Sequence, residues 1–339
     1  MRIEIGPFSA AHLDDAGSLL AARHRGDRTA APELPEEFED PGFARAQIES
    51  ALARPATTGV AATVDGRFAG FLLGSIVLPP PNVFWASILS PRSVEIPYAG
   101  YAAAGEDAEE IQREMYAALA GGWVAAGCFT HFIEVNANDR IAFDAWFSLG
   151  FGQYLTLAAR TTEPVSDGTA DRRSVEIRRA GADDIETIMH LSNGLWEHHA
   201  RTPMFVPYLL ESVPHLRTYQ LDLLSSPESP FWIAYDTDRP AGMQTFHQQT
   251  HAEMARPSRG IYLFEGYSDP AVRGSGVGTA LLRHSMDWAR SVGYEYCTLH
   301  YFSANISGAR FWQRSGFRPL AHRLVRRIDD RIAWATGRS

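Results

Sequence analysis

Cysteine is scarce in this sequence, and no hydrophobic run is long. The two cysteines, Cys128 and Cys297, are too few and too far apart for the disulfide framework of a small secreted protein. The longest apolar stretch, residues 68–78, ends at Pro79 and is too short to span a bilayer. The first residues alternate like a strand and lack the apolar core of a signal peptide. We therefore expect a cytoplasmic protein.

Basic residues are fewer than acidic residues in this sequence. The chain of 339 residues has 31 Lys and Arg against 40 Asp and Glu, which gives a formal net charge of -9. An acidic surface repels phosphate backbones and anionic lipids, so we expect neither nucleic acid nor membrane as a partner. Hydrophobic residues make up 45% of the chain, as in folded proteins, and its length exceeds what one hydrophobic core usually supports. These numbers predict two domains.

The second half of the sequence repeats features of the first half at a nearly constant spacing. The spacing is 172 residues at the start of each half, 169 around a Cys-x-x-His element and 166 near the end. Changes in loop length would produce such a drift, so we interpret the chain as two tandem copies of one unit. The matched pairs are Ile3-Glu4-Ile5 with Val175-Glu176-Ile177, residues 65–70 with 237–242, Cys128 and His131 with Cys297 and His300, Asn136 with Asn305, and Trp146, Gly150 and Phe151 with Trp312, Gly316 and Phe317.

The junction between the two copies is also recognisable. Residues 161–174 are polar, contain Pro164 and Gly168, and follow neither a helical nor a strand period, as is typical of a linker. We therefore place the domains at residues 1–160 and 175–330. Each copy mixes strands with helices, which predicts an α/β class with a mixed, mostly antiparallel sheet flanked by helices in each domain.

A glycine-rich turn in the second copy joins a predicted strand at residues 261–264 to a predicted helix at residues 279–292. Its sequence is Arg273-Gly274-Ser275-Gly276-Val277-Gly278. Glycines let backbone N–H groups converge on a ligand, and the start of a helix is electropositive, so the turn suits a pyrophosphate. A tight turn without a ligand is the alternative. The spacing excludes the G-x-x-x-x-G-K-[ST] and G-x-G-x-x-G phosphate loops.

A second motif follows the turn after a helix and a strand. R-x-x-G-x-G at Arg273, followed by N-x-x-[A/G]-x-x-F-[Y/W]-x-x-x-G-F from Asn305 to Phe317, resembles the GNAT superfamily of N-acetyltransferases. The resemblance covers the second half well and reaches the first half through the repeat. The tandem order is similar to that of actinobacterial two-domain members, a group that includes the mycothiol synthase. The resemblance therefore implies a fold of two tandem GNAT-like domains.

The resemblance implies acetyl-CoA as the cofactor and direct acyl transfer to an amine, without a covalent enzyme intermediate. The strand before the turn is expected to splay from its neighbour, so that a free backbone N–H polarises the thioester carbonyl. The residues expected to bind the cofactor are Tyr267, Ser268, Arg273, Gly274, Ser275, Gly276, Val277, Gly278, Thr279, Asn305, Phe311 and Trp312.

The sequence departs from the family at the general acid. Many members have a tyrosine where this chain has Trp312, and an indole N–H does not release its proton near neutral pH. Trp312 is therefore interpreted mainly as a packing residue. Glu265 is the candidate catalytic base, with a structural carboxylate as the alternative. A similar Glu-Gly pair in aminoglycoside 6′-N-acetyltransferases lies one residue further from the loop, a shift that would turn the side chain over unless a β-bulge restores it.

Other polar residues are candidates for the catalytic and acceptor sites. His300, on the last long strand of the repeat, is the second catalytic candidate. The region that follows the first helix of the second copy caps the acceptor pocket in relatives, so Trp196, His199, Phe205 and Tyr208 are expected to bind the acceptor. We expect no metal, because residues three apart in a strand face opposite sides and neither Cys-x-x-His element can chelate alone.

The first copy lacks a cofactor turn. Its stretch from Tyr101 to Glu110 retains Gly105 but carries four carboxylates, which would repel a pyrophosphate. We therefore expect one acyl-CoA site per chain and an enzyme that transfers an acetyl or short acyl group to a small amine, as a monomer or homodimer. The alternatives are a non-catalytic acyl-CoA-binding or regulatory protein and an acetyltransferase for a larger aminated natural product.

Overall fold

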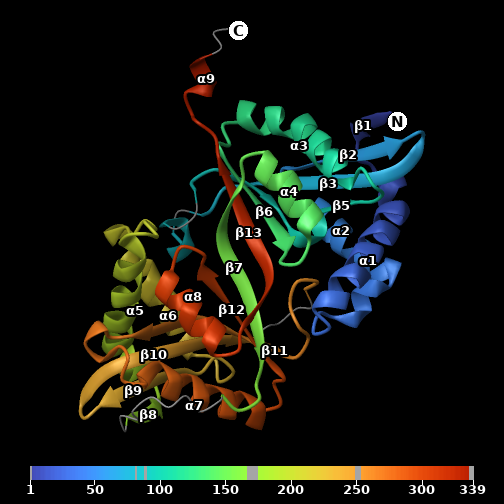
Figure 1. The fold of residues 1–339 in the computed structure, drawn as a ribbon. Coiled ribbons are helices and arrows are strands. Elements are labelled where there is room, and N and C mark those ends of the chain that lie inside the picture. Colours follow the sequence, from blue (N-terminus) through green and yellow to red (C-terminus); the bar gives the residue numbers. More distant parts are fainter. Residues whose placement is uncertain (1, 81, 88–89, 166–174, 249–252, 336–339) are drawn as a thin grey trace.

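The computed structural model describes residues 2–80, 82–87, 90–165, 175–248 and 253–335. Strands and helices are mixed along both halves of the chain, which confirms the α/β class (Figure 1). The first half contains β1 (Ile3–Pro7), α1 (Leu13–Ala30), α2 (Pro41–Leu52), β2 (Thr57–Val64), β3 (Arg67–Val77), β4 (Ser93–Ile96), β5 (Tyr101–Ala103), α3 (Ala108–Ala125), β6 (Thr130–Asn136), α4 (Arg140–Ser148) and β7 (Gly152–Thr161).

The second half repeats this order with one short strand fewer. Its elements are β8 (Glu176–Arg179), α5 (Ile185–Ala200), α6 (Val213–Leu224), β9 (Phe231–Asp236), β10 (Arg239–Gln248), β11 (Gly260–Ser268), α7 (Val277–Ser291), β12 (Tyr296–Phe302), α8 (Ile306–Arg314), β13 (Arg318–Arg327) and α9 (Ile332–Ala335). No helix among the described residues has the length and hydropathy of a membrane span.

The strands of both halves form one continuous sheet. Its order is β1-β2-β3-β4-β6-β13-β7-β12-β11-β10-β9-β8, and β5 pairs with β3 beside this path. Within this order, the last strand of each half is inserted into the strands of the other half. β13 pairs with β6 of the first half, and β7 pairs with β12 of the second half, while β7 and β13 also pair with each other (Figure 1). Each half therefore completes the sheet of the other.

The two halves have corresponding elements, but the spacing of 169 residues has to be corrected. The β2–β3 and β9–β10 hairpins turn where the sequence predicts, and Asp65, Gly66 and Thr237 have positive φ angles there. From β6 onward the spacing is uniformly 166 residues, because β6 and β12 have the same length and begin at Thr130 and Tyr296. The matching of the two Cys-x-x-His elements at a spacing of 169 is therefore wrong. The counterpart of Asn305 is Asp139, because each caps the helix that follows.

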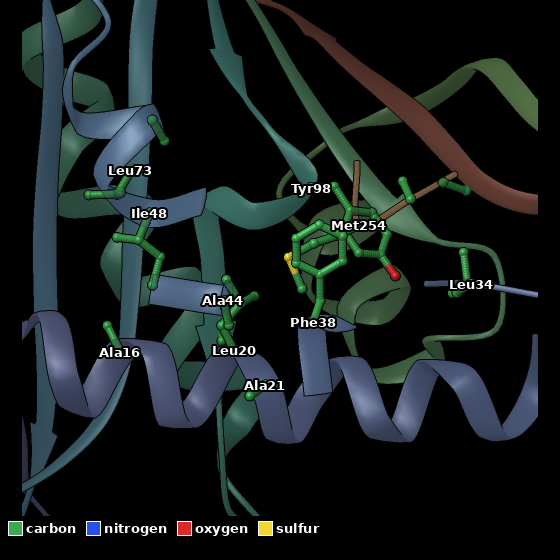
Figure 2. Close-up of a cluster of buried hydrophobic side chains, with 14 of the residues drawn as sticks. Ala16, Leu20, Ala21, Leu34, Phe38, Ala44, Ile48, Leu73, Tyr98 and Met254 are labelled. Atoms are coloured by element: carbon green, nitrogen blue, oxygen red, sulfur yellow. The ribbon is translucent and has the colours of Figure 1, made fainter. Parts of the chain in front are cut away.

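The hydrophobic core also joins the two halves. In Figure 2, Ala16, Leu20 and Ala21 of α1 face Ala44 and Ile48 of α2. The same cluster contains Met254, Leu320 and Ala321 of the second half, and Met254 lies beside Tyr98 and Phe38 (Figure 2). Of the predicted linker, Thr161 ends β7, the Thr162 N–H donates to the Glu295 carbonyl oxygen at 2.9 Å, and residues 166–174 lie outside the described residues.

Candidate acyl-CoA site

The site begins where β11 parts from β12. The two strands pair in parallel only over Gly260–Leu263 and Tyr296–Leu299, although both continue further. On its other edge β11 contains a β-bulge, because Thr245 of β10 faces Glu265 while Phe246 faces Leu263, which leaves Phe264 as the additional residue. The splay and the bulge both agree with the sequence-based expectations. Beyond Leu263, the β12 side of β11 has no strand partner among the described residues.

The glycine turn lies between β11 and α7. Gly274 and Gly276 have φ angles of +84° and +91°, a left-handed backbone that glycine adopts without strain. Gly276 is the N-cap of α7, no side chain caps this helix, and its first turn contains no acidic residue. A Cβ atom at Gly278 would lie 3.3 Å from Ser268 Oγ and 3.4 Å from the Phe311 ring. The turn thus offers uncapped N–H groups and close backbone approach, as a pyrophosphate requires.

A cavity of about 720 Å³ connects this turn to the splay and continues toward the first half. Its size is typical of small-molecule sites. The predicted cofactor-binding residues line it, except Ser275, whose Oγ donates to the Val272 carbonyl oxygen at 2.6 Å. The lining residues of this set are Tyr267, Ser268, Arg273, Gly274, Gly276, Val277, Gly278, Thr279, Asn305, Phe311 and Trp312.

Glu265 lines the cavity and is almost completely buried. Its Oε2 accepts hydrogen bonds from Ser192 Oγ and Gln220 Nε2, both at 2.7 Å, and its Oε1 accepts one from Trp196 Nε1 at 2.9 Å. Burial raises the pKa of Glu265, and the three donors oppose this effect because they stabilise the charged form. The carboxylate is therefore held in one orientation and is more basic than an exposed glutamate.

His300 also lines the cavity, and its Nδ1 lies 3.2 Å from the Tyr262 hydroxyl. Burial, together with the positive charges of Arg256 and Arg323, lowers the pKa of His300 to about 3. The imidazole is thus neutral near pH 7 and a weak proton acceptor. The catalytic role of His300 stays a prediction, and Glu265 is the stronger base of the two.

The predicted acceptor residues separate into two groups. Trp196 and His199 line the cavity, and burial lowers the pKa of His199 to about 4. Phe205 and Tyr208 do not line it. The Phe205 side chain is 71% exposed, and the Tyr208 hydroxyl donates to Asn193 Oδ1 at 2.6 Å. After α5 the chain turns away from the cavity, and Phe205 has a φ angle of +51°. Helical periodicity in the sequence does not reveal this change of direction.

Trp312 packs as the sequence analysis favours. Its ring lies 4.8 Å from the Phe311 ring and 5.4 Å from the Phe317 ring, and a Cβ atom at Gly266 would approach it to 3.0 Å. The indole thus supports the floor of the site below β11.

In the first half, side chains fill the region that corresponds to the cavity of the second half. Arg23 of α1 donates to the carbonyl oxygens of Tyr98 and Tyr101 and stacks on both rings. The Tyr98 hydroxyl donates to Asp27 Oδ2 at 2.5 Å and accepts from Asn136 Nδ2 at 3.0 Å. Helix α3 begins with two acidic residues, whereas α7 has none in its first turn. These contacts agree with the expectation of a single acyl-CoA site.

Several cavity residues escaped the sequence analysis because they lie on distant elements. Glu134 of β6 and Leu155 and Leu157 of β7 come from the first half, and Arg256 and Arg323 come from outside the two motifs. His198 also lines the cavity. No group of three or more metal-ligating side chains occurs within the part of the chain that the structure describes.

Comparisons with known proteins bear on the second half of the chain and on the fold. Residues 194–317 match the model of the Acetyltransferase (GNAT) family. A GCN5-related N-acetyltransferase from Sphaerobacter thermophilus has 12% sequence identity and a TM-score of 0.62, and the match covers 97% of this chain and 96% of that one. A tandem GNAT protein from the clavulanic acid biosynthesis pathway has 13% identity and a TM-score of 0.50, with 96% and 98% covered.

A third solved structure is the glucosamine N-acetyltransferase region of a fungal multi-domain GH3 β-N-acetylglucosaminidase, with 12% identity and a TM-score of 0.55 over 96% of this chain and 38% of that one. No curated protein matches the sequence. Residues 194–317 thus match the acetyltransferase (GNAT) family, and the chain as a whole has the fold of GCN5-related N-acetyltransferases, tandem GNAT proteins among them.

Proposed function

We propose that this protein is an acyl-CoA-dependent N-acetyltransferase that transfers an acetyl group from acetyl-CoA to an amine of a small molecule. The observation that carries the proposal is the single cavity that joins the uncapped glycine turn to the splay between β11 and β12. The glycine turn at one end of this cavity suits a pyrophosphate, and a buried base lies on β11 just beyond the point where β11 parts from β12.

The chain's own residues provide a cradle for acetyl-CoA. The N–H groups between Arg273 and Thr279 would bind the pyrophosphate, Tyr267 and Ser268 would lie beside the pantetheine arm, and Asn305 would lie on the opposite side. Bound there, acetyl-CoA supplies an activated acyl group as a thioester. The unpaired edge of β11 beyond Leu263 provides backbone N–H groups that can polarise its carbonyl.

Glu265 is the proposed base in this reaction. An alkylammonium cannot attack a thioester, so a proton has to leave the acceptor nitrogen, directly or through a water molecule. The raised pKa of Glu265 suits this task. Trp312 does not supply a proton to the departing thiolate, which is a tolerable leaving group near neutral pH.

Calorimetric titration and a turnover assay test the proposal together. Acetyl-CoA should bind with a stoichiometry near one, and free CoA should appear when a panel of primary amines is added. The sequence contains no lysine, so acetylation of lysine side chains of the protein cannot imitate turnover. Product should be measured by mass spectrometry, because Cys128 and Cys297 are free thiols that react with thiol reagents once exposed. Absence of acetyl-CoA binding would refute the proposal.

A non-catalytic acyl-CoA-binding protein is the second candidate, and Trp312 at the position of the usual acid favours it. Stoichiometric acetyl-CoA binding without acetylation of any amine in the panel would support this candidate. We further propose domains at residues 1–160 and 175–330, a mycothiol-synthase-like tandem arrangement, a cytoplasmic location, and a monomer or homodimer.

A further inference from the structure

The end of the cavity that is remote from the glycine turn has a floor built by both halves of the chain. Glu134 of β6 lies directly opposite Arg323 of β13, Arg323 opposite Leu155 of β7, and Leu155 opposite Phe302 of β12. All four residues line the cavity. The strand exchange therefore brings a carboxylate of the first half into the site of the second half.

The charges around Glu134 leave its carboxylate uncompensated. Arg323 donates to Glu95 Oε1 at 2.7 Å, and Arg256 Nε lies 3.1 Å from Glu253 Oε2, so each guanidinium already has its own acidic partner. The Glu134 side chain has no hydrogen bond or ion pair with any described residue. Burial raises the pKa of Glu134, while Arg256 and Arg323 oppose this effect from a distance. The three carboxylates of Glu95, Glu134 and Glu253 and the two guanidinium groups of Arg256 and Arg323 therefore sum to one negative charge. Of the three carboxylates, the one that lines the cavity is Glu134.

The sheet also fixes the separation between this carboxylate and the reaction centre. Neighbouring strands lie about 4.8 Å apart, so the three steps from β6 to β12 span roughly 14 Å. The thioester would lie at the splay of β11 and β12, which is one step further. An acceptor that reaches both places has to be elongated, and Leu155, Leu157 and Tyr262 between them favour an apolar middle.

We propose that Glu134 binds a second cationic group of the acceptor, and that the acceptor is an elongated amine with cationic groups at both ends. The inference rests on the proposed function, since it places the reacting nitrogen at the splay. A half-buried carboxylate without a partner is costly, and an ammonium group of the ligand would compensate it. A singly charged amine of the same length would leave Glu134 unpaired.

The binding of two matched probes to the CoA-loaded protein tests this inference without turnover. Calorimetry should compare 1,12-diaminododecane with n-dodecylamine, which share an apolar chain long enough for this separation and differ in the second ammonium group. We expect the diamine to bind at least about tenfold more tightly to the native protein, as for a desolvated charge pair. Glu134→Gln should abolish this preference and leave CoA affinity unchanged.

Glu114→Gln is the matched control, because it removes the same charge from an exposed side chain of α3 that does not line the cavity and is not one of the five charged groups around Glu134. It should retain the preference for the diamine, and thermal melts should show both variants folded. Equal affinity of the two probes for the native protein, a preserved preference in Glu134→Gln, or equal losses in both variants would overturn the inference. If neither probe binds while another amine is acetylated, the inference fails and the proposed function stands.

Discussion

The carboxylate of Glu265 lies where three donors from two helices meet. Ser192 and Trp196 belong to α5, and Gln220 belongs to α6. Each hydrogen bond stabilises the charged form, whereas burial disfavours it, and burial is the larger effect. The β-bulge at Phe264 directs the side chain toward these donors. A base in such a setting is fixed in place without losing its basicity.

Glu265→Gln should lower turnover by roughly 100-fold, the usual contribution of a general base, with CoA affinity nearly unchanged. The variant should also lose about 1–3 kcal/mol of stability, because a buried donor such as the Trp196 indole would face an amide N–H. The acid limb of the pH–rate profile, which reports deprotonation of Glu265, should disappear.

Trp196→Phe is the control, because it removes one donor and keeps the carboxylate. Losing a hydrogen bond to the charged form raises the pKa of Glu265 further, so the acid limb should move to higher pH. Full activity of Glu265→Gln across the pH range would assign the base to another group.

Helix α7 and the turn before it form the proposed anion-binding element. The helix has no capping side chain, and Gly276 holds the left-handed conformation at its start. Its counterpart α3 begins with Glu109 and Glu110 and follows a turn with Glu106 and Asp107. The two elements share a scaffold, and the charge at the helix start distinguishes them.

Gly276→Glu should weaken CoA binding by at least about 100-fold, because a carboxylate would oppose the pyrophosphate at the helix N-terminus. Any side chain at a φ angle of +91° also introduces strain of about 1 kcal/mol. Gly276→Gln carries the same strain without the charge, so its smaller loss isolates the electrostatic effect. Circular dichroism should show both variants folded.

Gly293→Glu completes this comparison at the opposite end of α7. Gly293 has a φ angle of +93° and does not line the cavity, so the variant should be strained and yet retain CoA affinity. Equal CoA affinities of Gly276→Glu and Gly276→Gln would show that the phosphates bind elsewhere.

The two halves share one sheet and several hydrophobic clusters. β7 lies between β13 and β12, and β13 lies between β6 and β7, so neither half can unfold without breaking strand pairs of the other. The proposed acceptor end of the cavity depends on this exchange, because Glu134 and Leu155 reach it only through β6 and β7.

We expect a single cooperative unfolding transition in urea, with coincident curves from near-UV and far-UV circular dichroism. Saturating CoA should shift the whole transition to higher urea, although the residues proposed to bind CoA all belong to the second half. Hydrogen exchange with and without CoA gives the spatial control, since amides of β6 should gain protection along with those of β12. Two separate transitions, of which CoA moves one, would contradict this coupling.

The protein should lose stability on mild acidification. Burial lowers the pKa of several histidines to about 4, and that of His300 to about 3, whereas the unfolded chain titrates near 6.5. Between these values the unfolded state binds more protons, so stability falls as the pH decreases from about 6.5. The raised pKa values of Glu134 and Glu265 act oppositely, and their stability cost grows as the pH rises above about 4.5. The histidines affected are His131, His199, His247, His300 and His322.

Urea titrations at pH 7, 6 and 5 measure this dependence. Because these five histidines outnumber the carboxyl groups whose pKa is raised by burial, Asp27, Glu134 and Glu265, the free energy of unfolding should decrease at each step. His300→Gln should reduce the slope by about 1.4 kcal/mol per pH unit, the value for one fully titrating group. Stability that stays constant or rises over this range would contradict the assigned burial of these histidines.

Short contiguous motifs of the sequence determined much of this site without help from the rest of the chain. The turn from Arg273 to Gly278, the helix that follows it and the segment from Asn305 to Phe317 form local structure, because glycine conformations, helix caps and helical periodicity act between near neighbours. The sequence therefore located the glycine turn that lines the cavity and the hairpins of both halves. It also indicated that Trp312 packs and that the first half lacks the glycine turn.

Only the tertiary structure decided which strands became neighbours. A period of two identifies the buried face of a strand but not its partner, and β7 and β13 are repeats of each other that suit either position beside β6 or β12. The exchange of these two strands placed Glu134 and Arg323 in the cavity. Likewise, the donors to Glu265 converge through packing of α5 and α6 on β11, across separations of 45 to 73 residues. Contacts between such distant segments depend on how the elements assemble, because no local rule of the backbone specifies them.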